Sequence, residues 1–420
     1  MVKLNRRCRF FLLLACLSWT KAALSQDSIK VYADPESMTG FKAAKFIEKI
    51  DFLPLETNKQ SKYRTGAGYQ IAGSDILIKD NTNNSIYLFD KKSGKFLHKY
   101  TNEKSRFVMS HIEYVPSKNA LFIKSINKHY TITDKKNTQL VRRWQGRDIS
   151  RYVRLTWLYL DKNYQVEQIP APAIALNNEF YYFDGGYIYR NYSNDNHTKD
   201  SILYRLVQYD GNNQIKHRYF PFLNLHGLWS DYYRYSLRLS ENSTLDDSSQ
   251  LFQLDFNPII YELRPDTLIE KYHFVFPMAN VMPVDFNSLS FRNNIDVQKY
   301  KDKNAKVFSD YFKMFEHGQY LIFATRTLSY QTRQFMLAGN ILYDLDKITT
   351  DSSIFNLPPN LLTQVFGQDQ QYLYTVASAP TLLKHKAALL KDKNLSSAFK
   401  AYLSVMTEQD NDIIIKIKLK

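Results

Sequence analysis

The candidate binding residues of this chain are concentrated between residues 225 and 235. The sequence there reads Leu-His-Gly-Leu-Trp-Ser-Asp-Tyr-Tyr-Arg-Tyr and interleaves aromatic rings with acidic and basic side chains. Rings flanked by hydrogen-bonding groups suit stacking against the faces of sugars, and loops on a rigid scaffold commonly carry binding. The alternative is that the segment packs over the edge of a sheet. If the segment is a binding site, the predicted contact residues are Trp229, Tyr232, Tyr233 and Arg234.

Residues that could carry catalysis show no recognisable spacing. The nine histidines are dispersed, no two of them stand four residues apart, and neither a Gly-x-Ser-x-Gly turn nor a phosphate-binding glycine loop occurs. The sequence therefore leaves any catalytic residue unknown, and we predict no metal ligands and no cofactor. The alternative is an enzyme whose ligands converge from distant segments, for which calcium is the candidate ion.

The first 25 residues resemble an export signal. A basic stretch ending at Arg9 precedes an apolar run, Phe10 to Trp19, that is too short to span a bilayer. Small residues at Ala23 and Ser25 predict cleavage between Ser25 and Gln26. We therefore expect a periplasmic, cell-surface or secreted protein with no transmembrane span once the leader is removed.

A competing interpretation of the leader is a lipoprotein signal. Leu13-Leu14-Ala15-Cys16 resembles a lipobox, which would place a lipid on Cys16 and anchor the protein at the outer membrane. Both cysteines, Cys8 and Cys16, lie within the first 25 residues. Cleavage after Ser25 would leave no thiol, and with it no disulfide, zinc–thiolate site or iron–sulfur cluster.

The formal charge of +15 is partly a property of the leader, which contains five Lys or Arg and no acid. The remaining basic residues are scattered, which is typical of a solvated surface. The alternative is attraction to an acidic partner, such as an anionic glycan or a lipid head group. Export argues against nucleic acid as the partner.

Repeated hairpins indicate the fold class. The clearest copy is Ser85–Asp90 turning into Lys95–Tyr100, and looser copies occupy residues 203–220 and 259–274. Six such units, including 107–146 and a third from about 165 to 222, are typical of a radial all-β architecture. The alternating strand 413–420 lacks a nearby partner, and the strand from Ile50 to Leu55 would complete its blade.

These patterns together predict a six-bladed β-propeller closed by its N- and C-terminal strands. The expected organisation is a signal peptide at 1–25, a lead-in at 26–46 and a propeller at 47–420. A Leu-, Ala- and Lys-rich insertion at about 381–407 is expected to form one or two helices, packed on the sixth blade or docked on a partner or membrane surface.

The segments from Phe52 to Thr57, 85–100 and 258–277, together with the ending EQDNDIIIKIKLK, resemble the NHL-repeat-like six-bladed β-propellers exported by Bacteroidetes. The resemblance implies fold and compartment rather than a reaction. The favoured function is a ligand-binding or protein-interaction module, with glycans and envelope proteins as candidate partners. The alternatives are a metal-dependent lactonase or lyase with a site in the central channel, and a structural component of an envelope assembly.

Overall fold

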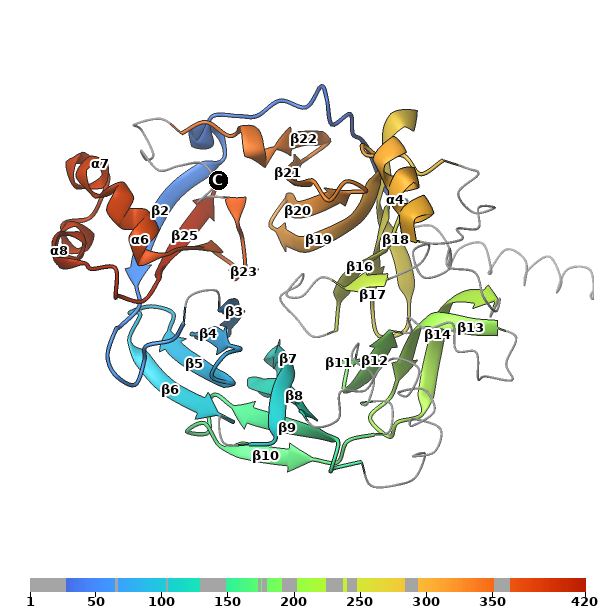
Figure 1. The fold of residues 1–420 in the computed structure, drawn as a ribbon, viewed down its shortest axis with the longest axis horizontal. Coiled ribbons are helices and arrows are strands. Elements are labelled where there is room, and N and C mark those ends of the chain that lie inside the picture. The colour runs from blue at the N-terminus through green and yellow to red at the C-terminus, as the bar shows by residue number, and fades with distance from the viewer. Residues whose placement is uncertain are drawn as a thin grey trace, which may run out of the picture.

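Six sheets lie around a common centre, and each has one end strand innermost and the other outermost (Figure 1). The computed structural model describes residues 28–64, 67–102, 105–128, 149–172, 175, 180–190, 202–223, 237–239, 248–283, 294–350 and 363–420. The chain is therefore folded as a six-bladed β-propeller, which confirms the fold predicted from the repeated hairpins.

Five blades follow one another along the chain, and the sixth combines both ends of it. Blade 1 contains β3 (Gly68–Ala72), β4 (Asp75–Asp80), β5 (Ser85–Asp90) and β6 (Phe96–Thr101). Blade 2 contains β7 (Phe107–Val115), β8 (Ala120–Asn127), β9 (Val153–Tyr159) and β10 (Val166–Ile169). Blade 3 contains β11 (Phe180–Phe183), β12 (Gly186–Arg190), β13 (Ile202–Tyr209) and β14 (Ile215–Leu223).

Blade 4 contains β15 (Leu237–Leu239), β16 (Gln250–Leu254), β17 (Ile259–Leu263) and β18 (Leu268–Val275). Blade 5 contains β19 (Phe308–His317), β20 (Tyr320–Thr327), β21 (Thr332–Ala338) and β22 (Ile341–Asp344). Blade 6 contains β23 (Gly367–Gln368), β24 (Leu373–Ala377), β25 (Ile413–Leu419) and, outermost, β2 (Ile47–Pro54).

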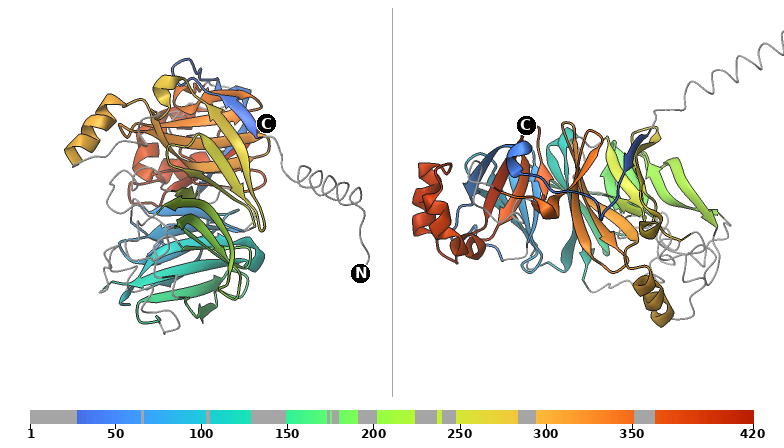
Figure 2. Two further views of the ribbon diagram at one scale, coloured as in Figure 1. Left: turned by 90° about the vertical axis from the view of Figure 1, so that its right-hand side faces the viewer. Right: turned by 90° about the horizontal axis from the view of Figure 1, so that it is seen from above.

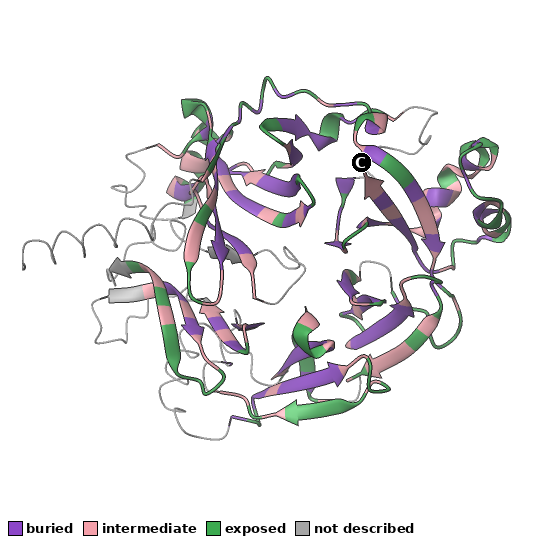
Figure 3. Ribbon diagram, turned by 180° about the vertical axis from the view of Figure 1, so that it is seen from behind, coloured by how far each residue is buried: buried purple, intermediate pink, exposed green. Residues whose placement is uncertain are grey.

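The three hairpins visible in the sequence are the third and fourth strands of blades 1, 3 and 4. Each pair contains a register shift, next to Phe89, Tyr209 and Tyr261 respectively. The middle strands read as nearly continuous apolar runs because each blade packs against a neighbour on both of its faces. All but the last residue of β5 are buried, whereas no residue of the outermost strand β6 is (Figure 3).

The sixth blade closes the ring as the sequence predicts. β2 pairs with β25 antiparallel, and the register places Ile50 opposite Ile417 and Phe52 opposite Ile415. Blade 6 therefore has four strands and ends in β2 on its outer side, so β25 is not left as an unpaired outer edge.

The segment before β2 does more than lead into the propeller. β1 (Ile29–Tyr32) joins blade 4 as a fifth strand, parallel to β18. The chain then crosses the outer edge of blade 5 before it enters blade 6. Three blades are thus connected by residues 28–54, which we call the N-terminal strap.

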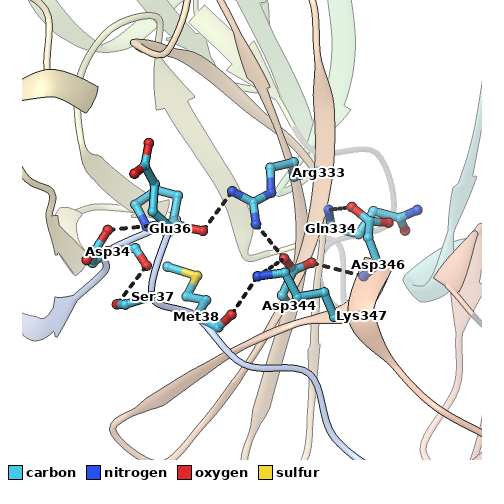
Figure 4. Close-up of polar contacts among 10 residues, drawn as sticks. Asp34, Glu36, Ser37, Met38, Arg333, Gln334, Asp344, Asp346 and Lys347 are labelled. Atoms are coloured by element: carbon cyan, nitrogen blue, oxygen red, sulfur yellow. Dashed lines mark hydrogen bonds and ion pairs between the residues drawn. The ribbon is translucent and has the colours of Figure 1, made fainter.

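The strap is attached to blade 5 by side-chain and backbone contacts (Figure 4). Arg333 donates to the carbonyl of Pro35 at 2.9 Å and also pairs with Asp344, which is buried. Lys347 Nζ donates to the carbonyl of Met38 at 2.8 Å. Gly40 is required here, because a Cβ at that position would lie 1.9 Å from the Lys347 carbonyl oxygen.

The helical insertion packs on blade 6. Three helices occur where one or two were expected: α6 (Ala379–Lys384), α7 (Lys386–Lys391) and α8 (Ser397–Val405). The Phe399 ring of α8 stacks on the Phe52 ring of β2 with centroids 4.4 Å apart, and Leu382, Leu389 and Leu403 are fully buried. This supports packing on the blade as the role of the insertion. None of the helices in the described parts of the chain is long and apolar enough to cross a bilayer.

Blade 2 differs from its expected boundaries. Its third and fourth strands, β9 and β10, lie beyond residue 146, where the unit was expected to end, and β10 falls in the range assigned to the third unit. The expected strands between residues 130 and 144 lie outside the described residues. The sequence of β10, Val-Glu-Gln-Ile, did not predict a strand because it is largely exposed and lacks an apolar face.

Candidate ligand-binding face

The two faces of the propeller carry different kinds of connection. Strands alternate in direction within a blade, so turns after the first and third strands lie on one face, which we call the turn face. Connections after the second and fourth strands lie on the opposite face, which we call the connection face. β3 and β4 are joined by Gly73 and Ser74 alone, whereas residues 128–152 separate β8 from β9 and residues 378–412 separate β24 from β25.

Helix α4 (Asn294–Lys303) shows how far the connection face extends. It lies in the connection between β18 and β19 and projects away from the disc (Figure 2). Longer connections give a propeller the freedom to build a binding surface without disturbing its blades. The connection face is therefore the candidate functional face.

The turn face is held together by ion pairs between blades. Lys271 of blade 4 lies 3.0 Å from Glu262 of its own blade and 2.7 Å from Glu316 of blade 5. Tyr272 donates to Glu316 at 2.6 Å. Burial opposes ionisation of Glu262, but hydrogen bonds from Arg264, Ser249 and Lys271 outweigh it and lower its pKa to about 2.

A second ion pair connects blade 6 to blade 1 on the same face. Lys91 donates to Asp369 at 2.8 Å, and Tyr374 donates to the same carboxylate at 2.6 Å. Burial again opposes ionisation, but these two hydrogen bonds, together with those from the Gln371 and Tyr372 amides, lower the pKa of Asp369 to about 2. Contacts of this kind stabilise a fixed arrangement of blades, which suits a scaffold better than a reaction site.

A buried carboxyl group lies at the joint between blades 6 and 1. Asp412, which immediately precedes β25, accepts hydrogen bonds from Tyr69 and, at 3.4 Å, from Tyr63. Burial raises the pKa of Asp412 despite these two hydrogen bonds. Perturbed carboxyl groups are candidates for acid–base chemistry. Both hydroxyl groups are directed at this carboxylate, however, and the arrangement seals the joint at which the ring closes.

A small pocket lies between blades 4 and 5 on the connection face. Phe256, Phe276, Phe308 and Tyr311 contribute to its lining, and it has room for about one water molecule. The Tyr311 hydroxyl is buried and has no hydrogen-bond partner among the described residues. A single water would satisfy this hydroxyl, but the pocket is too small for an organic ligand.

Basic side chains gather where blade 2 meets the connection face. Arg106 precedes β7, Lys128 follows β8, and Arg151 and Arg154 lie at the start of β9. We call these four residues the blade 2 basic cluster. Their backbones are connected: Lys128 N donates to the Arg106 carbonyl at 2.9 Å, and Asn127 Nδ2 donates to the Arg151 carbonyl at 2.9 Å.

One aromatic ring organises two of these cations. The guanidinium carbons of Arg154 and Arg106 lie 4.0 Å and 5.5 Å from the centroid of the Phe107 ring. Phe107 is buried and begins β7, the innermost strand of blade 2. The cluster therefore extends from the innermost strand of blade 2 to its third strand.

The residues predicted from sequence to form a site lie elsewhere in the chain. Trp229, Tyr232, Tyr233 and Arg234 belong to the connection between β14 and β15, which is outside the described residues. The same is true of Cys16, Ser25 and Gln26. In the described parts of the chain, no group of three or more His, Cys, Asp or Glu side chains is placed to hold a metal ion.

The blade 2 basic cluster was not identified from the sequence. Its members are separated by up to 48 positions, from Arg106 to Arg154, and they appear there as scattered surface charges. The sequence contains one indication of the cluster, which is the position of its members next to strand ends. Arg106, Lys128 and Arg151 each flank a strand of blade 2 on the same face.

A family model described as a 6-bladed beta-propeller matches residues 21–104, which contain the N-terminal strap and blade 1. No curated protein matches the chain. A crystal structure of a putative exported protein from Bacteroides fragilis aligns over 93% of this chain and 99% of that one, with a TM-score of 0.59 and 14% identity. The chain is a six-bladed β-propeller similar to this Bacteroides protein.

A second solved structure, a member of the duf4221 family from Bacteroides vulgatus, aligns over 89% of this chain and 97% of that one. Its TM-score is 0.40 at 8% identity. The B. fragilis structure therefore shows the shared propeller fold, and the chemistry of this propeller must be inferred from its own side chains.

Proposed function

We propose that the protein is an exported binding module that recognises a glycan on its connection face. The observation that carries this proposal is the asymmetry of the two faces. Tight turns and inter-blade ion pairs occupy the turn face, while the extended connections and the blade 2 basic cluster occupy the opposite one. A rigid scaffold with one variable face is suited to recognition.

Two features of the sequence support the same function. The N-terminal segment has the composition of an export signal, which would bring the protein into contact with envelope or extracellular polysaccharides. The aromatic segment at 225–235 lies in a connection that leaves β14 and enters β15, so both of its attachment points are on the connection face.

Binding of the purified chain to a panel of neutral and acidic polysaccharides, followed by thermal shift and calorimetry, tests the proposal. We expect saturable binding that Trp229→Ala weakens without changing the melting temperature. Tyr32→Ala is the matched control, because Tyr32 is an exposed ring on β1, the outermost strand of blade 4.

Binding that is unaffected by Trp229→Ala would move the site away from the aromatic segment. A silent panel together with a stoichiometric copurifying metal would instead favour the lactonase or lyase class. A silent panel with copurifying envelope proteins would favour a structural role.

A further inference from the structure

Three of the four members of the blade 2 basic cluster carry a positive charge that no ion pair with a described residue neutralises. No ion pair joins Arg106, Lys128 or Arg154 to a carboxylate within the described parts of the chain. Arg333 and Arg264, by contrast, are paired with Asp344 and Glu262. A ligand would therefore displace no described carboxylate from Arg106, Lys128 or Arg154.

A further basic residue lies between blades 1 and 2. Lys79 at the end of β4 donates to the carbonyl of Ser110 on β7 at 3.4 Å. The adjacent carboxylate of Asp80 is buried and accepts hydrogen bonds from the Thr82 and Asn83 amides.

The geometry also restricts how the guanidinium groups can move. Arg154 and Arg106 both lie against the Phe107 ring, so their guanidinium carbons are at most about 10 Å apart. A planar guanidinium held against a ring keeps its N–H edge free to bind a carboxylate or sulfate through two parallel hydrogen bonds. Holding two cations close together without a counterion is unfavourable, and an anionic ligand would relieve this repulsion.

We propose that the blade 2 basic cluster binds the acidic groups of an anionic polysaccharide. This inference rests on the proposed function and adds that the ligand is anionic and that blade 2 contacts its acidic groups. A flexible polymer can enter the centre of the face, where the cluster lies beside the innermost strand. A flat bilayer would first meet α4, which projects from the disc (Figure 2).

The test compares Arg106→Gln/Lys128→Gln/Arg154→Gln with a control of equal charge change, Lys384→Gln/Lys391→Gln/Lys393→Gln. The control residues are exposed on and after helices α6 and α7. The probes are polygalacturonate and dextran sulfate, with neutral dextran and vesicles containing anionic lipid as the other arms. Circular dichroism and thermal melting confirm that each variant is folded, and single substitutions replace the triple variant if it is not.

We expect the cluster variant to bind polygalacturonate or dextran sulfate about tenfold to a hundredfold more weakly than the unmodified protein. The control should bind normally, and the affinity of the unmodified protein should fall as salt is raised. Equal loss in both variants, or binding that salt does not weaken, would overturn the proposal. So would vesicle binding that depends on the cluster while the acidic polymers do not bind.

Failure of this inference differs from failure of the proposed function. If the cluster variant keeps full affinity while Trp229→Ala loses it, the protein binds glycans without using these charges. If no polysaccharide binds either the unmodified protein or its variants, both proposals are wrong.

Discussion

Ile50 on β2 lies opposite Ile417 on β25, so the two ends of the chain share one buried β-ladder. Both side chains are nearly inaccessible, with 7% and 2% of their surfaces exposed. The pairing makes blade 6 a joint product of two segments that are far apart in the sequence, and the blade cannot form until both have been synthesised.

Deletion of residues 413–420 should abolish soluble expression. The deletion removes β25 and leaves β24 and β2 without their shared partner, since both pair with that strand. Exposed edges of this kind promote aggregation. Expression trials and size-exclusion chromatography measure the outcome, and a truncated protein that melts like the full chain would contradict closure by β25.

A milder test of the same ladder is Ile415→Ala. The Ile415 side chain is fully buried, and its truncation should lower the free energy of unfolding by about 2–4 kcal/mol. Lys418→Ala on the same strand is the control. It removes a part-exposed ion pair with Glu48 and should cost less than about 1 kcal/mol. Urea denaturation measures both.

The N-terminal strap should depend on the small size of Gly40. Gly40→Ala would place a methyl group 1.9 Å from the Lys347 carbonyl oxygen, so the strap must move away from blade 5. We expect a loss of about 1–3 kcal/mol and faster amide hydrogen exchange in residues 38–46. At Gly68 an added Cβ has only an ordinary contact at 3.9 Å, and Gly68→Ala should leave both quantities nearly unchanged.

The ion pairs of the turn face should make the free energy of unfolding depend on pH. The pKa of Glu262 is about 2 in the folded protein, below its ordinary value of 4.5, so the stabilisation is complete above pH 4.5 and is lost as the pH falls toward 2. Glu262→Gln should lower the free energy of unfolding by on the order of 2 kcal/mol at pH 7, with a difference that shrinks below pH 4.

The control for this prediction is Glu270→Gln on β18, because Glu270 is exposed. It should change stability by less than about 0.5 kcal/mol at any pH. Denaturant titrations at several pH values provide the measurement. A difference between Glu262→Gln and the unmodified protein that stays constant from pH 7 to pH 2.5 would show that ionisation of Glu262 does not stabilise the joint.

The hairpins in the sequence predict the fold because their signal is local. The continuous apolar run of β5 turns into β6 within one short segment, so apolar runs and turn residues are sufficient to identify the pair. Ring closure was also predictable, since the terminal strand alternates strictly and needs a partner. The β10 strand was not, because Val-Glu-Gln-Ile is an exposed outer strand with no apolar pattern.

The basic cluster required the structure for a different reason. Arg106, Lys128 and Arg154 become neighbours only through the pairing of β7 with β8 and of β8 with β9. The meeting of Arg106 and Arg154 at the Phe107 ring depends on which face of each strand a side chain occupies, and a one-residue change in register reverses that face. Composition and local spacing contain no such information.

Asp412 should respond to pH in the opposite direction from Glu262. Its pKa is raised by burial above the ordinary value of 3.8, so ionisation is harder in the folded protein than in the unfolded chain. Stability linked to this group should therefore increase as the pH falls through the folded pKa. Asp412→Asn keeps an acceptor oxygen for Tyr69 and cannot ionise, so it should raise the free energy of unfolding at pH 7 and have a smaller effect at low pH. Tyr69→Phe removes a hydrogen bond to the carboxylate and should instead enlarge the penalty at neutral pH.

Urea titrations of both variants between pH 4 and pH 8 separate the effect of ionisation from the effect of the lost hydrogen bond. If Asp412→Asn destabilises the protein equally at every pH, Asp412 serves the joint through its hydrogen bonds alone and its ionisation has no cost.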